Sequence, residues 1–235
     1  MFNCSNDSVE RAVTATGASW PVALRHGTLT LRPLRRGDRR AWEEQRQANE
    51  DWLTPWDATS PVPGAAPSSF GQMVRWHGRQ GRAGTSYTWG VALDEDAPGR
   101  DRLVGLLSLG GVQYGSVMSG AVGYWIDRRH AGRGLTPTAV AMTVDWAFRG
   151  LGLHRVEVNI RPENTASLRV VEKLGLREEG LRRAYLHVDG GWRDHRSFAV
   201  TAEEVPEGLL SRWLASRPRD GAPARRGPET EVTRR

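Results

Sequence analysis

The stretch from Tyr124 to Phe148 reads YWIDRRHAGRGLTPTAVAMTVDWAF, and it decides the fold of this chain. Its first residues are apolar and aromatic, which is typical of a buried strand. A basic loop containing Gly132 and Gly134 follows. A helix then begins, for which we predict Thr136 as the N-cap and Pro137 as the first helical residue. The stretch therefore predicts a strand, a glycine loop and a helix N-terminus in succession.

This succession of elements suits the binding of a phosphate group. Glycines allow the backbone to come close to a ligand, and the first N–H groups of a helix have no partner within it. The helix dipole favours an anion there, and Arg128, Arg129 and Arg133 add positive charge. An ordinary strand-to-helix turn has the same outline, so the stretch alone leaves both interpretations open.

A second stretch, residues 154–176, reads HRVEVNIRPENTASLRVVEKLGL. Its pattern predicts a strand from Val156 to Ile160, a turn from Pro162 to Asn164, and a second helix from about Ser167. The two stretches together, with a later hairpin, carry six short motifs whose order and spacing narrow the interpretation.

These motifs resemble those of the GNAT superfamily of acyl-CoA-dependent N-acetyltransferases. The detailed likeness is to the RimJ/RimL-type branch, which acetylates the N-termini of ribosomal proteins, and it covers roughly Leu29 to Val200. The motifs are YWID (Tyr124–Asp127), GRG (Gly132–Gly134), GLHRVE (Gly152–Glu157), PENTAS (Pro162–Ser167), EKLG (Glu172–Gly175) and DGGWRDH (Asp189–His195).

The resemblance implies an α+β fold of the GNAT type, with a mixed central β-sheet flanked by helices. Its two central parallel strands, ending near Ile126 and Ile160, would splay apart and leave backbone groups available to a ligand. We expect a flexible N-terminal tail over residues 1–21, the acetyltransferase domain over residues 22–215, and a disordered basic tail over residues 216–235.

Local signals predict further elements along the chain. Asp38 is expected to cap one helix, and Ser68 or Ser69 a second helix that Gly81 ends. Asp189-Gly190 predicts the turn of a β-hairpin. Strands are predicted at LTLRPL (Leu29–Leu34), SYTWGVAL (Ser86–Leu93) and LVGLLSL (Leu103–Leu109), and a last helix within VPEGLLSRWLASR.

For the donor, the resemblance implies a set of acetyl-CoA-binding residues. Backbone N–H groups near Ile126 and Asp127 would polarise the thioester carbonyl. Asn164 would contact the pantetheine arm, although asparagine equally suits a turn or a helix cap. Ala131 and Thr136 depart from the residues that relatives often carry. The pyrophosphate would lie on the backbone of Arg133, Gly134, Leu135 and Thr136.

For catalysis, the resemblance places Ser167 where relatives have a hydroxyl near the sulfur, so that it would assist departure of the thiolate. A serine in the first turn of a helix is the competing interpretation. Glu157 alternates with apolar neighbours and would either face the cleft as a base or form a salt bridge. His195 is more simply a structural histidine. We assign no metal ligands.

Trp52 and Trp56 lie in a proline-rich loop that would either rim a peptide groove or pin itself to the core. The formal charge of +6 and the pI of about 10.3 suit anionic partners such as CoA or ribosomal RNA. Cys4 is the sole cysteine, and the N-terminus has no apolar signal segment. No apolar run approaches membrane-spanning length. We therefore expect a cytoplasmic protein without membrane contact.

We predict an acetyl-CoA-dependent N-acetyltransferase acting on a protein N-terminal α-amine, such as the alanine or serine of a ribosomal protein. An α-amine, with a pKa near 7.7–8.0, needs a weaker base than lysine does. Two alternatives stay open: a small-molecule amine acetyltransferase, for an aminoglycoside or polyamine, and a ribosome- or RNA-binding module with a degenerate acyl-CoA site. The sequence leaves the oligomeric state undetermined.

Overall fold

The computed structural model describes residues 20–62, 64, 69–94 and 101–217. Eight strands of these residues form one mixed sheet in the order β1-β2-β3-β4-β5-β6-β8-β7. The strands are β1 (Leu24–His26), β2 (Leu29–Pro33), β3 (Tyr87–Asp94), β4 (Asp101–Gln113), β5 (Ser119–Ile126), β6 (Arg155–Ile160), β7 (Arg177–Val188) and β8 (Gly191–Thr201). The predicted strands are thus present, in a GNAT-type α+β architecture.

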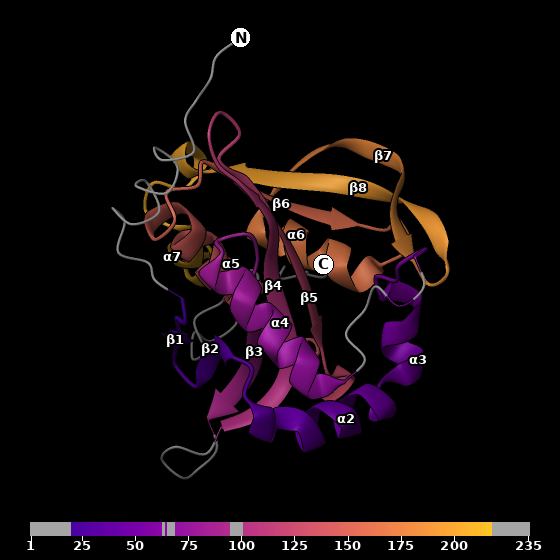
Figure 1. The fold of residues 1–235 in the computed structure, drawn as a ribbon. Helices are drawn as coiled ribbons and strands as arrows, with labels where there is room; N and C mark the ends of the chain where they lie inside the picture. The colour runs from indigo at the N-terminus through magenta and orange to yellow at the C-terminus, as the bar shows by residue number, and fades with distance from the viewer. Residues whose placement is uncertain (1–19, 63, 65–68, 95–100, 218–235) are drawn as a thin grey trace, which may run out of the picture.

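Helices flank this sheet on both sides (Figure 1). The α-helices are α2 (Arg39–Ala48), α3 (Glu50–Leu53), α4 (Phe70–Arg82), α5 (Leu135–Arg149), α6 (Thr165–Leu174) and α7 (Leu209–Ser216). Short 3₁₀ helices are η1 (Arg36–Asp38), η2 (Thr54–Trp56), η3 (Arg128–His130) and η4 (Ala202–Glu204). None of the helices in the described ranges is both long and apolar enough to cross a membrane.

The sheet opens at its centre, as the family resemblance predicts. Strands β5 and β6 run parallel and pair only over residues 119–121 and 155–157. Beyond Ala121, β5 keeps its antiparallel partner β4 and β6 keeps its antiparallel partner β8. After these paired residues β5 and β6 therefore diverge. Each strand leaves one row of backbone N–H and C=O groups facing the gap between them.

Neighbouring residues of β5 show which helices cover which face of the sheet. The hydroxyl of Tyr124 reaches the backbone of Ser167 in α6. The ring of Trp125 meets the ring of Trp42 in α2, with the centroids 5.3 Å apart. Because successive side chains of a strand point to opposite faces, α6 and α2 lie on opposite sides of the sheet.

The main core lies on the α6 side, where α5 packs across the sheet and α6 and α7 pack beside it. The face of α5 that meets the strands is apolar, and Val140, Val144 and Ala147 are fully buried. Burying such side chains is worth about 25 cal/mol per Å² of apolar surface. This packing fixes α5, and with it the start of α5, relative to the gap between β5 and β6.

Three helix starts differ from the predictions or refine them. Helix α5 begins at Leu135, so its N-cap is Gly134 and not Thr136. Helix α6 begins at Thr165, two residues before the predicted start. Asp38 precedes α2 but does not cap it, because its carboxylate accepts hydrogen bonds from the backbone of Arg35 and from a buried guanidinium. Elsewhere, Ser69 caps α4 as predicted.

The structure describes only a small part of the two predicted tails. The predicted tails fall largely on residues 1–19 and 218–235, which lie outside the described ranges. Trp20, which we assigned to the N-terminal tail, packs on Tyr87 and Trp89 with centroid distances of 5.7 and 5.4 Å. The folded domain therefore includes Trp20 and begins before the predicted boundary at Val22.

The β7–β8 hairpin forms one edge of the sheet and reaches towards the segment after α3 (Figure 1). Its turn is built by Asp189 and Gly190, both with positive φ, as the Asp-Gly pair predicts. Near this turn, Ala58 forms an antiparallel bridge with Val188. The hairpin tip and the loop after α3 are thus held together beside the gap.

Candidate active site

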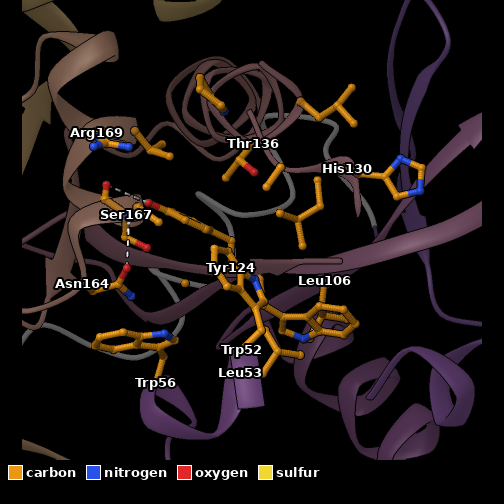
Figure 2. Close-up of a pocket in the computed structure, with 18 of the residues that line it drawn as sticks. Trp52, Leu53, Trp56, Leu106, Tyr124, His130, Thr136, Asn164, Ser167 and Arg169 are labelled. Atoms are coloured by element: carbon orange, nitrogen blue, oxygen red, sulfur yellow. Dashed lines mark hydrogen bonds between the residues drawn. The ribbon is translucent and has the colours of Figure 1, made fainter. Parts of the chain in front are cut away.

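A cavity of about 720 Å³ occupies the place where β5 and β6 diverge. It is lined by the end of β5, by the N-terminal turns of α5 and α6, and by five residues after α2, which are Trp52, Leu53, Trp56, Asp57 and Ala58. Figure 2 shows Tyr124 in the middle of this cavity, Thr136 on one side, and the indoles of Trp52 and Trp56 on the other. The stretches that motivated the sequence predictions therefore meet at one site.

The N-terminus of α5 is left open by its own sequence. Gly134 has φ 79°, and no side chain caps the helix. The first backbone bond of the helix runs from Thr138 N–H to the Gly134 carbonyl at 3.2 Å, and Pro137 has no N–H. The N–H groups of Leu135 and Thr136 therefore have no acceptor within the helix. Both residues line the cavity.

The glycine loop leaves space for a ligand close to the backbone. Gly132 has φ 78°, and a β-carbon built there would have no atom within 4 Å. Together with the free N–H groups and the positive end of the α5 dipole, this open surface fits a diphosphate. The family resemblance predicts that the pyrophosphate of acetyl-CoA binds at this place, and the open backbone surface suits that prediction.

The side chain of Asp127 fixes the start of the loop that follows β5. Its buried carboxylate accepts hydrogen bonds of 3.0 Å from both the backbone and the guanidinium Nε of Arg129. Burial acts to raise the pKa of Asp127, but the hydrogen bonds from Arg129 outweigh it and hold the pKa at about 2. The backbone N–H of Arg128 donates to the side-chain oxygen of Asn49, between α2 and α3, at 2.9 Å. The loop is therefore anchored before the phosphate site begins.

Only one of the two N–H groups expected to bind the thioester carbonyl is oriented for it. Asp127 N–H donates to the Val104 carbonyl in β4 at 2.8 Å, so it is already used and does not line the cavity. Because N–H groups alternate along a strand, the N–H of Ile126 points away from β4 and towards the gap. Ile126 lines the cavity and keeps its predicted role as a proposal.

Cations cluster near the glycine loop. The guanidinium of Arg133 lies 3.1 Å from Nδ1 of His130, and it does not itself line the cavity. Partial burial lowers the pKa of His130, and the charges of Arg102 and Arg133 lower it further. Nδ1 of a neutral His130 therefore accepts a hydrogen bond from Arg133. The predicted contact between the Arg133 backbone and the pyrophosphate stays a prediction.

The N-terminus of α6 is closed, in contrast to that of α5. Asn164 is the N-cap, and its side-chain oxygen accepts the backbone N–H of Ser167 at 3.0 Å. The capping interpretation of Asn164 thus applies, and Asn164 also lines the cavity. Ser167 lines the same cavity from the first turn of α6, as Figure 2 shows.

Tyr124 braces this turn from the sheet. Its hydroxyl donates to the Ser167 carbonyl at 3.4 Å. Burial raises the pKa of Tyr124 well above its usual value, so the hydroxyl stays protonated at any physiological pH. The sequence alone could not reveal that Tyr124 braces α6. The two segments are far apart in sequence, and they meet only when α6 packs against the folded sheet.

Glu157 lies outside the cavity lining and is fully engaged in ion pairs. One carboxylate oxygen accepts from Arg155 Nε at 3.0 Å and the other from Arg182 Nη2 at 2.7 Å. Its partner across the sheet is Ala121, where β5 and β6 are still joined. Of the two alternatives that the sequence left open for Glu157, the structure has the salt bridge, and a role as base has no geometric support.

His195 is buried on β8 and also lies outside the cavity lining. Its Nδ1 is 3.0 Å from the Arg193 carbonyl, and burial lowers its pKa. This environment keeps the ring neutral near pH 7. The structural interpretation of His195 therefore fits its surroundings.

The far wall of the cavity is apolar and firmly held. Trp56 lines it, and the Arg161 guanidinium lies 5.3 Å from the centroid of its ring. Arg161 also donates to the Pro55 carbonyl at 2.7 Å. Both interpretations of Trp56 therefore apply, because it is pinned to the domain and it faces the cavity. Sequence analysis missed Arg161, which is 106 positions from its partner Pro55.

Among the residues that the structure describes, the carboxylates lining this cavity are Asp57 and Glu163, and both are paired with arginine. Arg46 Nη1 donates to Asp57 at 3.0 Å, and Arg161 Nε donates to Glu163 at 3.2 Å. Arg46 and Asp57 are eleven positions apart, and the chain between them passes through the end of α2, α3 and η2, so no single helical periodicity could reveal the pair. The described lining of the cavity therefore offers an incoming amine substrate an aromatic surface and no unpaired carboxylate.

Comparison with known proteins agrees with this geometry. Residues 28–177 match the family model described as an acetyltransferase (GNAT) domain. The chain belongs to the GNAT family of acetyl-CoA-dependent N-acetyltransferases. The matched segment contains the splayed strands, the glycine loop and the N-terminal turn of α6, and it ends at the first residue of β7.

Individual GNAT proteins resemble the chain over different lengths. A probable N-acetyltransferase of Bacillus subtilis, YjcK, is 38% identical over 114 residues, which are 48% of this chain and 61% of that protein. The [ribosomal protein uS5]-alanine N-acetyltransferase of Escherichia coli is 27% identical over 173 residues, which are 73% and 87% of the two chains.

Among solved structures, that of Mycobacterium smegmatis RimJ in complex with CoA-disulfide is similar to this chain. It superposes with a TM-score of 0.75 at 35% identity, covering 84% of this chain and 95% of that one. The GNAT fold predicted from the motifs is thereby confirmed. The relatives include ribosomal-protein acetyltransferases, so the expected branch of the family is confirmed as well.

Proposed function

We propose that this GNAT protein transfers an acetyl group from acetyl-CoA to the α-amine at the N-terminus of a protein. The observation that carries the proposal is the two-ended cavity, with an open anion site at the start of α5 and an apolar wall around Trp56 opposite. The similarity to ribosomal-protein acetyltransferases supports a ribosomal protein as acceptor, with alanine or serine first. Such an acceptor implies reaction in the cytoplasm.

On the donor side, the residues of the cavity divide the work. The N–H groups of Leu135 and Thr136 bind the pyrophosphate, and Asn164 lies along the path of the pantetheine arm. The N–H of Ile126 stabilises negative charge that develops on the thioester oxygen. The hydroxyl of Ser167 donates a hydrogen bond to the sulfur as the carbon–sulfur bond breaks.

On the acceptor side, the amine must arrive uncharged. The two cavity carboxylates, Asp57 and Glu163, are each held by an arginine, and Glu157 lies outside the cavity. An α-amine, whose ordinary pKa is near 7.7–8.0, is partly neutral at physiological pH, whereas lysine with about 10.4 is not. The site is therefore better suited to an α-amine, which loses its proton to water or to a weak base.

The same ion pairs argue against a polyamine or an aminoglycoside. Polycations bind most readily to free carboxylates, and the carboxylates lining this cavity are already neutralised. The open and well-ordered anion site also argues against a degenerate acyl-CoA site. Contact with ribosomal RNA, which the basic charge suggested, stays a prediction.

A competition between two peptides tests the proposed function. One peptide carries a free N-terminal alanine and blocked lysines, and the other carries a blocked N-terminus and free lysines. With acetyl-CoA, the chain is expected to acetylate the first peptide faster, at a rate that rises with pH through the titration of the α-amine. Faster acetylation of the second peptide would refute the assignment and favour a lysine-directed enzyme.

A further inference from the structure

We infer that Arg217, at the end of α7, is a further ligand for the diphosphate of acetyl-CoA. The inference rests on the proposed function and adds to the glycine loop a cation that comes from a different part of the chain. Arg217 lies 40 residues beyond the end of the segment that matches the family model.

Helix α7 runs antiparallel to α5 and brings its C-terminal end to the glycine loop. At its start, Leu209 N–H donates to the Asp145 carboxylate in the middle of α5 at 2.6 Å. One turn later, the indole N–H of Trp213 donates to Thr138 Oγ1, in the first turn of α5, at 2.9 Å. The last residues of α7 therefore lie beside the N-terminus of α5.

The guanidinium of Arg217 reaches the loop itself. A β-carbon built on Gly134 would lie 3.8 Å from both Cζ and Nη2 of Arg217. The guanidinium also lies over the Trp213 ring, 5.7 Å from its centroid, which holds it on this side of α7. Across the described ranges, no carboxylate pairs with Arg217, so its charge is available to a ligand.

The electrostatics of α7 show why a cation is needed at this point. The carbonyl end of a helix carries partial negative charge, and α7 directs that end towards the place where the diphosphate would lie. Arg217 follows the last helical residue and reverses the sign of the local field. Its five N–H donors match the oxygens of a phosphate group.

A purely local role, in which Arg217 only completes the end of α7, makes a different prediction. A local role would affect the stability of α7 and would not distinguish a ligand with a diphosphate from one without it. Arg212 offers a matched control, because it lies on the same helix and donates to the Leu174 carbonyl at 2.6 Å, away from the loop.

Calorimetric titration of the full chain with acetyl-CoA, and displacement titration with pantetheine, separates these roles. Arg217→Gln is expected to weaken acetyl-CoA binding roughly fivefold to tenfold and to leave pantetheine binding unchanged. The loss should shrink at high salt because charge attraction is screened, and Arg217→Lys should recover part of it. Arg212→Gln is expected to bind acetyl-CoA like the unaltered chain.

Unchanged acetyl-CoA affinity in Arg217→Gln, or an equal loss for pantetheine, would overturn the inference. An equal loss in Arg212→Gln would also overturn it, because disturbance of α7 alone would then explain the effect. If the unaltered chain fails to bind acetyl-CoA at all, the proposed function falls, and the inference falls with it.

Discussion

Helices α5 and α6 both begin at the cavity, yet their N-termini are built in opposite ways. Gly134 turns the chain into α5 with a left-handed backbone and offers no side chain to the free N–H groups. Asn164 turns the chain into α6 and closes its first turn by accepting the N–H of Ser167. The cap residue therefore decides whether a helix start can receive a ligand or instead fixes the position of a side chain.

The difference has an energetic side. A side-chain cap is worth roughly 1 kcal/mol, which α5 forgoes in the free protein. A bound diphosphate supplies the missing hydrogen bonds, so that ligand binding stabilises the folded chain. In α6 the N–H of Ser167 already has its acceptor in the side chain of Asn164, so the cap fixes the position of Ser167 without a ligand.

The largest effect is expected from changing the open cap. Gly134→Val places a side chain against Trp213 and Arg217 at the cavity-lining start of α5, and it forces a β-branched residue into a left-handed conformation. We expect acetyl-CoA affinity to fall roughly tenfold or more, and stability to fall by about 1–2 kcal/mol. Calorimetry and urea unfolding measure these two quantities separately.

Gly115→Val is the matched control, because Gly115 has φ 75°, close to that of Gly134, and no neighbouring atom within 4 Å of a built β-carbon. It lies in the turn between β4 and β5, away from the cavity lining. The same loss of stability with full acetyl-CoA affinity is expected there. Equal loss of affinity in both variants would mean that general strain, and not the loop, is responsible.

On the α6 side, the next effect concerns turnover. Ser167→Ala removes the hydroxyl that we propose donates to the sulfur, but it leaves the backbone N–H that donates to Asn164. We expect the rate of the chemical step to fall roughly tenfold while acetyl-CoA affinity changes little, because CoA thiolate is already a fair leaving group. Single-turnover kinetics measure the step. An unchanged rate would reduce Ser167 to a helix-start residue.

The contrast between the two helices also shows what sequence analysis could and could not find. The glycine loop, both helices and the Asp189-Gly190 turn follow from short-range rules. Capping rules favour a side-chain acceptor and therefore predict Thr136 as the N-cap of α5, whereas a site that binds an anion at the helix start is better served by a cap without a side chain, as at Gly134. The rule failed at the position where we propose that the ligand binds.

Long-range contacts were out of reach for a different reason. Arg161 on Pro55 and Arg217 beside Gly134 join segments that are distant in sequence and become neighbours only in the folded sheet. For Glu157, alternation along β6 correctly implied a polar face, but periodicity carries no information about which residues pair with it. Only the register of β7 and β8 brings Arg182 to its carboxylate.

A smaller effect is expected from removing the closed cap. Asn164→Ala leaves the N–H of Ser167 without its acceptor and should lower the free energy of unfolding by about 1 kcal/mol. Asn164→Asp keeps an acceptor at the same place and should retain most of the stability. Urea unfolding of the two variants checks this. Equal loss in both would show that the amide nitrogen, and not the cap, matters.

The smallest effect concerns the brace between β5 and α6. Tyr124→Phe removes the hydroxyl that donates to the Ser167 carbonyl at 3.4 Å, a long hydrogen bond. We expect a loss of about 0.5 kcal/mol in unfolding free energy and a similarly small change in turnover. Loss of most activity in Tyr124→Phe, with stability intact, would instead assign this hydroxyl a direct part in the reaction.

The central claim, that the start of α5 is open to a diphosphate and the start of α6 is closed, can be tested in one measurement. Backbone amide resonances of the isotope-labelled chain are followed while ADP, which carries a diphosphate but no pantetheine, is added. We expect the amides of Gly134, Leu135 and Thr136 to shift, and those of Ala166 and Ser167 to stay in place. Shifts confined to the α6 residues, or none in the glycine loop at saturating ADP, would contradict the account.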